Sequence, residues 1–180
     1  MAAVKKLIER IELASAAASI TFSDIPQTFT DLYLTLSLRT TGGAAGGYQT
    51  YIKINSSTSG NSWRNLLGTG SSAVSQSSAS DGTGLRITMS SSNGDTANTF
   101  GNSALYLPNY TSSVAKSVSG DNVSENNATA STQTITAGLW SGTDPITSIE
   151  IFGSGTNLAQ YSSASLYGMR KGSDGTTTVS

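Results

Sequence analysis

Hydrophobic and polar residues alternate one by one along much of this chain. The clearest case lies within residues 31–39, where leucines at positions 32, 34, 36 and 38 alternate with polar or amphipathic residues. A period of two buries one face of a β-strand, whereas a helix would scatter these leucines around its circumference. The preceding segment from Asp24 to Gln27 combines turn residues with a proline that fixes φ. We therefore expect the chain to reverse there between two strands of an antiparallel sheet.

Further stretches of this kind are bounded by clusters of Gly, Ser, Asn and Asp. They predict strands at Ser19–Phe22, Asp31–Arg39, Tyr48–Ile54, Leu85–Met89, Thr99–Leu107, Lys116–Ser124, Gln133–Trp140, Ile146–Phe152 and Ser163–Met169. So many short strands predict an all-β fold, an antiparallel β-sandwich or jelly roll, and the 180 residues suit a single domain. The Gly/Ser-rich segments 41–47 and 68–84 are interpreted as long surface loops within that domain.

The N-terminal residues 1–13 are open to two interpretations. Apolar residues from Val4 to Ile11 have the i, i+3, i+4, i+7 spacing of an amphipathic helix. Alternatively, Leu7, Ile11 and Leu13 share one face of a strand or of an extended arm. We prefer a strand because the rest of the chain reads as β-structure.

Composition excludes several classes of partner. Charged residues make up only 12% of the chain and the formal net charge is −1, so the clustered Lys and Arg that bind nucleic acid are missing. Charged residues interrupt the apolar N-terminus, and no apolar run is long enough to span a bilayer. We therefore expect neither a nucleic-acid partner nor a membrane partner, and we expect the chain to be made in the cytoplasm.

The residue inventory also limits catalytic chemistry. The chain has no histidine and no cysteine, so catalytic triads that need either residue are excluded, and zinc would lack its two favoured ligands. A glycosidase would need two facing carboxylates, but most of the acids lie in predicted turns, where aspartate commonly caps the backbone. The segments Asp81–Gly84, Asn93–Asp95 and Gly120–Asn122 lack the acidic pattern of a calcium loop. We predict no catalytic, cofactor or metal site.

Aromatic residues offer a different kind of site. Seven tyrosines together with Trp63 and Trp140 could form a platform that stacks on sugar rings. Aromatic residues are also ordinary strand residues, and Trp140 closes a strand with alternating apolar residues. We therefore place Trp140 in the core or at a subunit interface.

Four pieces of the chain carry a family resemblance in their order and spacing. They are ITFSDIPQTFTDLYL (Ile20–Leu34), LYLPNYTSS (Leu105–Ser113), KSVSGDNVSENNAT (Lys116–Thr129) and ITAGLWSGTDPITSIEIFGSGTNLAQYSSASLYGM (Ile135–Met169). Together they resemble a family of structural proteins of tailed-bacteriophage virions. The resemblance covers nearly the whole chain.

The resemblance implies a β-sandwich or jelly roll that assembles as a homotrimer on the phage particle. Its members serve as capsid decoration proteins, bound to the major capsid protein, or as domains of tail or head fibres that bind a host receptor or glycan. Because we see no rod, repeat or anchoring segment, we expect a decoration (cement) protein on the virion. A fibre tip that binds a host surface glycan is the alternative.

Both chain ends are candidates for attachment to the capsid. The candidates are Val4, Lys5, Lys6, Leu7, Ile8, Arg170 and Lys171, although residues 170–180 also suit a flexible C-terminal tail. For the subunit interface the candidates are Tyr110 and Trp140.

Overall fold

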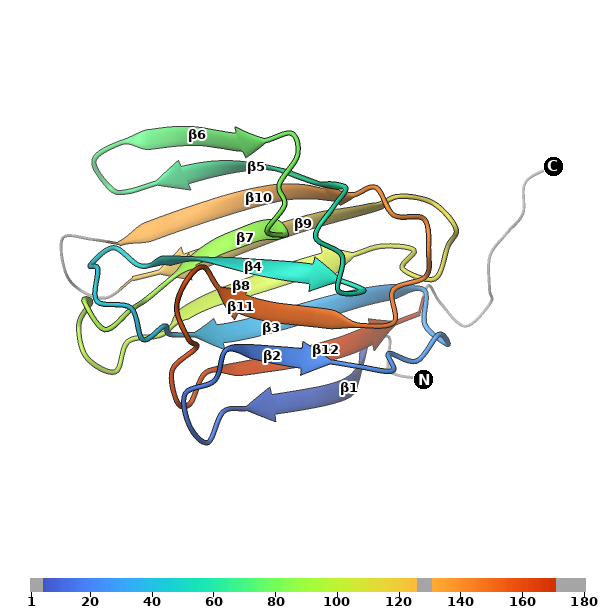
Figure 1. Ribbon diagram of the computed structural model, residues 1–180, viewed down its shortest axis with the longest axis horizontal. Helices are drawn as coiled ribbons and strands as arrows, with labels where there is room; N and C mark the ends of the chain where they lie inside the picture. The colour runs from blue at the N-terminus through green and yellow to red at the C-terminus, as the bar shows by residue number, and fades with distance from the viewer. Residues whose placement is uncertain (1–4, 126–130, 171–180) are drawn as a thin grey trace.

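The computed structural model describes residues 5–125 and 131–170, and all regular secondary structure within them is β-strand. The strands are β1 (Lys5–Glu12), β2 (Ser19–Phe22), β3 (Asp31–Leu38), β4 (Tyr48–Ile54), β5 (Asn61–Gly68), β6 (Ala73–Ser78), β7 (Leu85–Ser90), β8 (Gly101–Leu107), β9 (Lys116–Ser124), β10 (Thr132–Trp140), β11 (Ile149–Gly153) and β12 (Ser163–Met169) (Figure 1). In these ranges no helix is present that could cross a membrane.

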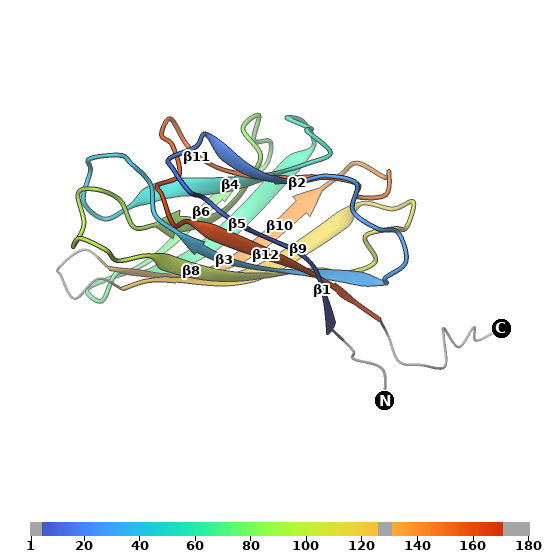
Figure 2. The same cartoon turned by 90° about the horizontal axis from the view of Figure 1, so that it is seen from below.

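The strands form two sheets that pack face to face (Figure 2). The large sheet has eight strands in the order β1-β12-β3-β8-β9-β10-β5-β6, and the small sheet has four in the order β2-β11-β4-β7. Neighbouring strands run antiparallel throughout. The prediction of an all-β antiparallel sandwich is confirmed.

The strand pairing is nested. β1 pairs with β12 and β3 with β8 in the large sheet, while β2 pairs with β11 and β4 with β7 in the small sheet. Two hairpins, β5–β6 and β9–β10, are inserted into this pattern and widen the large sheet beyond β8. In Figure 1, β6 lies at the edge of the large sheet, beyond the border of the small sheet. β5 beside it keeps a buried inner face, where Trp63 is 7% exposed and its ring centre lies 5.2 Å from the guanidinium of Arg86 on β7.

The core lies between the two sheets. The leucines of β3 point inward and are at most 4% exposed, and they meet isoleucines from β4 and β11 of the small sheet, such as Ile52 and Ile151. Burying one such side chain stabilises the fold by about 1.5–3 kcal/mol. The residues between the leucines point outward, as the period of two predicts.

The second strand of the inserted hairpin corrects one prediction. Residues 68–84 are not all loop, because β6 lies within them, and β5 was not predicted either. The inward side of β5 carries the buried amides Asn61 and Asn65, and β6 has no apolar alternation because the small sheet does not cover it. Backbone pairing with β10 and β5 holds these strands in place.

At the N-terminus the strand interpretation is confirmed and the helix interpretation is wrong. β1 pairs along β12, and a bulge at Ile8 shifts the register between Leu7 and Glu9. The extra residue of the bulge shifts the alternation of side chains between the two faces of the strand. Ile8 and Ile11 therefore pack against the core, whereas Leu7 is 48% exposed.

The segment from Asp24 to Gln27 turns the chain, but it does not form a hairpin. It leads from β2 in the small sheet to β3 in the large sheet, so the two flanking strands are not partners. The Gln27 amide donates to the carbonyl of Ile146 at 2.9 Å, and the Tyr110 hydroxyl donates to the carbonyl of Pro26. These bonds fix the corner between the sheets.

Candidate functional site

The outward side of the large sheet, called here the outer face, is the surface with most features of a binding site. Three hollows of about 330, 270 and 260 Å³ are lined by its outward side chains or by residues at its rim. Neighbouring positions on paired strands share a face, so the register places distant segments of the chain together here.

Three tyrosines lie in register across the outer face. Tyr167 of β12 is opposite Tyr33 of β3, which is opposite Tyr106 of β8. The ammonium of Lys5 lies 3.5 Å from the ring centre of Tyr33 and 4.3 Å from that of Tyr167. These cation–π contacts place the Lys5 ammonium over Tyr167 and Tyr33, at the end of the row nearest β1. Tyr106 lies at the opposite end of the row.

Tyr106 is held in one orientation by a buried acid. Its hydroxyl donates to Oδ2 of Asp31 at 2.9 Å, and the backbone N–H of Asn109 donates to Oδ1 at 2.8 Å. Burial raises the pKa of Tyr106, and the bond to Asp31 raises it further. Tyr106 therefore stays neutral, and its hydroxyl is anchored to Asp31.

The hollow of about 330 Å³, called here the tyrosine hollow, lies beside this row. Tyr33 and Tyr106 line one side, the small residues Ala104 and Ser119 line the middle, and Asp121 and Ile135 line the far side. Ala104 of β8, Asp121 of β9 and Ile135 of β10 lie opposite one another in register. The hollow therefore combines aromatic rings, a narrow floor and one exposed carboxylate.

An apolar strip adjoins the tyrosine hollow. Leu66 and Ile135 are direct partners across β5 and β10, with 55% and 59% of their surfaces exposed, and Leu139 on the same face is 40% exposed. The 260 Å³ hollow is lined by Leu66, Ile135 and their neighbours. Contiguous exposed apolar residues of this kind mark surfaces of association.

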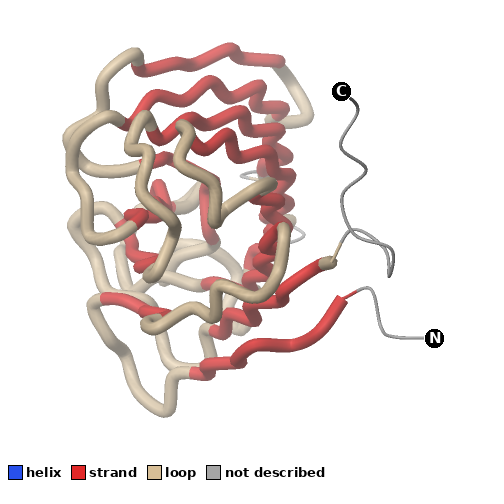
Figure 3. Tube along the Cα trace, turned by 90° about the vertical axis from the view of Figure 1, so that its right-hand side faces the viewer, coloured by secondary structure: helices blue, strands red, loops and turns tan. Residues whose placement is uncertain are grey.

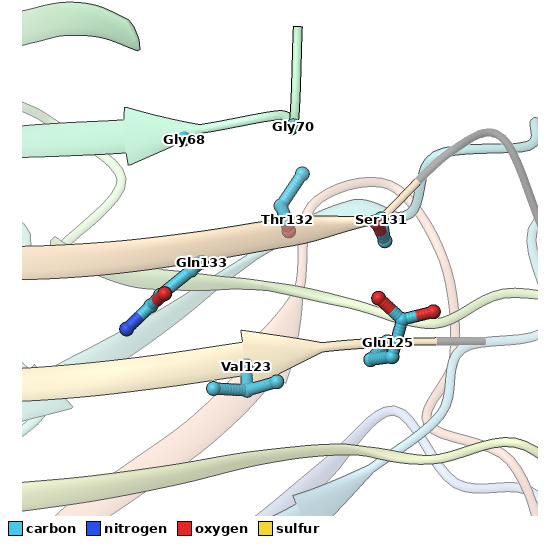
Figure 4. A pocket seen from close by; sticks show the side chains of 7 residues that line it. All are labelled: Gly68, Gly70, Val123, Glu125, Ser131, Thr132 and Gln133. Atoms are coloured by element: carbon cyan, nitrogen blue, oxygen red, sulfur yellow. The ribbon is translucent and has the colours of Figure 1, made fainter. Parts of the chain in front are cut away.

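The remaining hollow lies at the rim where β9 ends and β10 begins. Figure 4 shows the Glu125 carboxylate beside Ser131 and Thr132, with Val123 and Gln133 along the strands. It holds a single acid, whereas acid–base catalysis by a carboxylate pair needs two.

The structure brings the predicted attachment residues together. Lys5 lies opposite Met169, so the start of β1, which carries Lys5, Lys6, Leu7 and Ile8, lies beside the end of β12 (Figure 3). Arg170 follows directly, and its guanidinium lies 5.6 Å from the ring centre of Phe29. The other two candidates, Val4 and Lys171, lie outside the described residues.

The two residues predicted for the subunit interface lie elsewhere. Tyr110 is fully buried and Trp140 is 4% exposed, and both belong to the core of a single chain. A neighbouring subunit cannot reach their rings, so this prediction is corrected. For Trp140 the alternative of a core residue holds.

Two aspartates, Asp81 and Asp95, organise loops, as their turn-like settings predict. Asp81 accepts hydrogen bonds from the Trp63 indole at 2.7 Å and from the Thr83 N–H at 2.8 Å. Asp95 likewise accepts from two backbone N–H groups, those of Gly46 and Ser92. Among residues 5–125 and 131–170, no three His, Cys, Asp or Glu side chains gather in a way that could hold a metal.

A buried lysine closes one end of the sandwich. Lys116 is 1% exposed, and its ammonium donates to the carbonyls of Ser112 at 2.7 Å, of Val114, and of Thr143 at 3.4 Å. Burial lowers the pKa of Lys116, and Asp144 opposes that shift. The lysine ties two loops together and lines none of the three hollows described above.

Sequence reasoning did not find the outer face as a site. Its members come from β3, β8, β9, β10 and β5, and only their register places them side by side. The available signal was the alternation itself, which marks Tyr33, Tyr106 and Ile135 as outward residues of their strands.

Comparison with known proteins adds no relative. No protein-family model matches the sequence, and no curated protein is significantly similar to it.

Proposed function

We propose that this chain is a structural protein of a tailed-bacteriophage virion, a capsid decoration protein that assembles as a homotrimer on the major capsid protein. The observation that carries the proposal is the outer face, where exposed apolar residues and shallow hollows are spread over the large sheet. Such a surface suits association with other proteins. The proposal assigns the protein no catalytic role and no cofactor.

The strand order supports the proposal at the level of the fold. Nested pairing of eight strands in two sheets supports a jelly roll, an architecture common in viral capsid domains. This agrees with the resemblance of segments such as Ile135–Met169 to phage virion proteins. Because a fold hosts many functions, we treat this agreement as an analogy and rest the proposal on the surface.

The subunit interface is assigned to the apolar strip. Leu66, Ile135 and Leu139 are the large apolar side chains that the outer face exposes most along β5 and β10. Burial against a second and third copy would remove this surface from water, at about 25 cal/mol per Å². Closed cyclic assembly is the usual way for a homo-oligomer to satisfy such a patch.

Attachment to the capsid is assigned to the paired ends of β1 and β12. β1 is an edge strand, but its charged residues and the bulge at Ile8 oppose pairing with a further strand. Attachment would therefore use side chains, chiefly the exposed Leu7. Exposed charges such as Lys6 add only about 0–1 kcal/mol each.

Sedimentation equilibrium of the purified protein tests the assembly. We expect a trimer, and we expect Leu66→Asp to shift it toward monomer because a charge would be buried at the interface. The matched control is Ser165→Asp on β12, which lies on the same face away from the strip. A wild-type monomer, or equal effects of the two variants, would count against this interface.

Quantification of the protein in purified particles tests the role. We expect hundreds of copies per particle, and particles lacking the protein should resist heat and osmotic shock less well. A handful of copies would point instead to a fibre tip, and equally robust particles would remove the decoration role.

A further inference from the structure

We propose that the tyrosine hollow is a binding site for a neutral saccharide, presented as the end of a glycan. This goes beyond a structural role, because a decoration protein needs no ligand of this kind. The inference rests on the residues of the hollow and does not depend on where the protein lies on a particle. Ile135 belongs both to the hollow and to the apolar strip, so the inference requires that the trimer leave the side of the hollow lined by Tyr33 and Ser119 open.

The hollow pairs an aromatic side with a polar side. One face of a pyranose ring consists of C–H groups, which complement the negative face of an aromatic ring. Tyr33 and Tyr106 supply aromatic surface on one side of the hollow. Tyr106 is fixed by its bond to Asp31, so binding costs little further ordering of its side chain.

Asp121 supplies hydrogen-bond acceptors on the opposite side of the hollow. Asp121 is exposed, and its carboxylate accepts no hydrogen bond from any described residue, so its oxygens are available to two adjacent sugar hydroxyls. Ser119 between the two sides offers a hydroxyl that both donates and accepts. The volume of about 330 Å³ is at the small end of ligand pockets and suits one sugar ring.

Other ligand classes fit this hollow poorly. A peptide strand would need a free strand edge, but β3, β8, β9 and β10 are each paired on both sides. No Lys or Arg lines the hollow, so a phosphate or an acidic sugar would meet only the Asp121 carboxylate. Lys5 is on β1, beyond β12, and its ammonium lies over the ring of Tyr33 without lining the hollow.

The test is saturation-transfer NMR of the full-length protein with methyl glycosides of glucose, galactose, mannose and N-acetylglucosamine. We expect at least one to bind with a Kd in the millimolar range, and Asp121→Ala to weaken it about tenfold or more. N-acetylneuraminic acid should bind more weakly than the neutral glycoside because its carboxylate is repelled by Asp121. Asp121→Asn should reduce this difference in affinity.

A matched pair of variants locates the site. Ser119→Leu fills the floor of the hollow and should abolish binding, whereas Ser117→Leu, on the same strand and face but outside the hollow, should leave it unchanged. Should Ser119→Leu fail to fold, Asp121→Ala decides the question. Absence of binding by all four glycosides, equal loss in both serine variants, or wild-type affinity in Asp121→Ala would overturn the proposal.

Discussion

Replacement of the buried Lys116 by methionine should destabilise the fold. Methionine matches the length and volume of the lysine stem but cannot donate a hydrogen bond. The carbonyls of Ser112 and Val114 would lose their donor, while the bond to Thr143 at 3.4 Å is long enough to contribute little.

The magnitude follows from two opposing effects. Hydrogen bonds to a charged group contribute about 1.5–3 kcal/mol each, so two of them contribute about 3–6 kcal/mol. Against this stands the cost of burying the ammonium, which is the reason the pKa of Lys116 is lowered. The carbonyls belong to loops at the end of the sandwich, where Val114 is 56% exposed, so water can partly replace the donor. We expect a net loss of about 2 kcal/mol in the free energy of unfolding.

Urea unfolding followed by tryptophan fluorescence measures this loss. A change of about 2 kcal/mol also lowers Tm by roughly 4–8 °C in a domain of this size. Lys6→Met on the exposed strand β1 is the control and should change stability by less than about 0.5 kcal/mol. If Lys116→Met is as stable as the wild type, the cost of burying the charge cancels its bonds and the reasoning is refuted.

Three further predictions concern the acid, the glycine and the tryptophan that pack around the sheets. Burial alone would raise the pKa of Asp81, but hydrogen bonds, the largest from the Trp63 indole, outweigh it, and the pKa is lowered. Asp81 therefore stabilises the fold above its unfolded pKa of about 3.9, and this contribution is lost as pH falls through the folded pKa. Asp81→Asn should lower the free energy of unfolding by about 1 kcal/mol at neutral pH. The variant should also lose less stability than the wild type as the pH falls into the acid range, and an equal loss in both proteins would contradict the assignment. Gly120→Ala should destabilise by about 1–3 kcal/mol, because its Cβ would overlap Leu105, and a neutral result in thermal unfolding would show that this contact relaxes. Trp140→Ala should cost about 3–5 kcal/mol, with the loss independent of protein concentration as befits a core residue, whereas a loss that varies with concentration would restore an interface role.

The sequence alone determined the class of fold and part of the site chemistry. The alternating leucines of residues 31–39 specify a strand with one buried face, because side chains on successive strand residues point to opposite sides. The absence of histidine and cysteine excludes whole classes of catalyst whatever the fold. Clusters of Gly, Ser and Asn located most turns, because these residues tolerate turn backbones.

The tertiary structure decided which residues of different strands are neighbours. Alternation states which way a side chain points but not which strand is its neighbour, so the row of Tyr167, Tyr33 and Tyr106 could not be read from the chain. β6 shows no apolar alternation because backbone pairing with β5 holds it at the edge of the sheet, where neither of its faces is buried. Trp140 illustrates the same limit. From the sequence, an aromatic residue at the end of a strand suits a core or a subunit interface equally well, and only the structure shows that Trp140 is buried within the chain. Local sequence fixes the orientation within each strand, while register and burial depend on segments far apart in the chain.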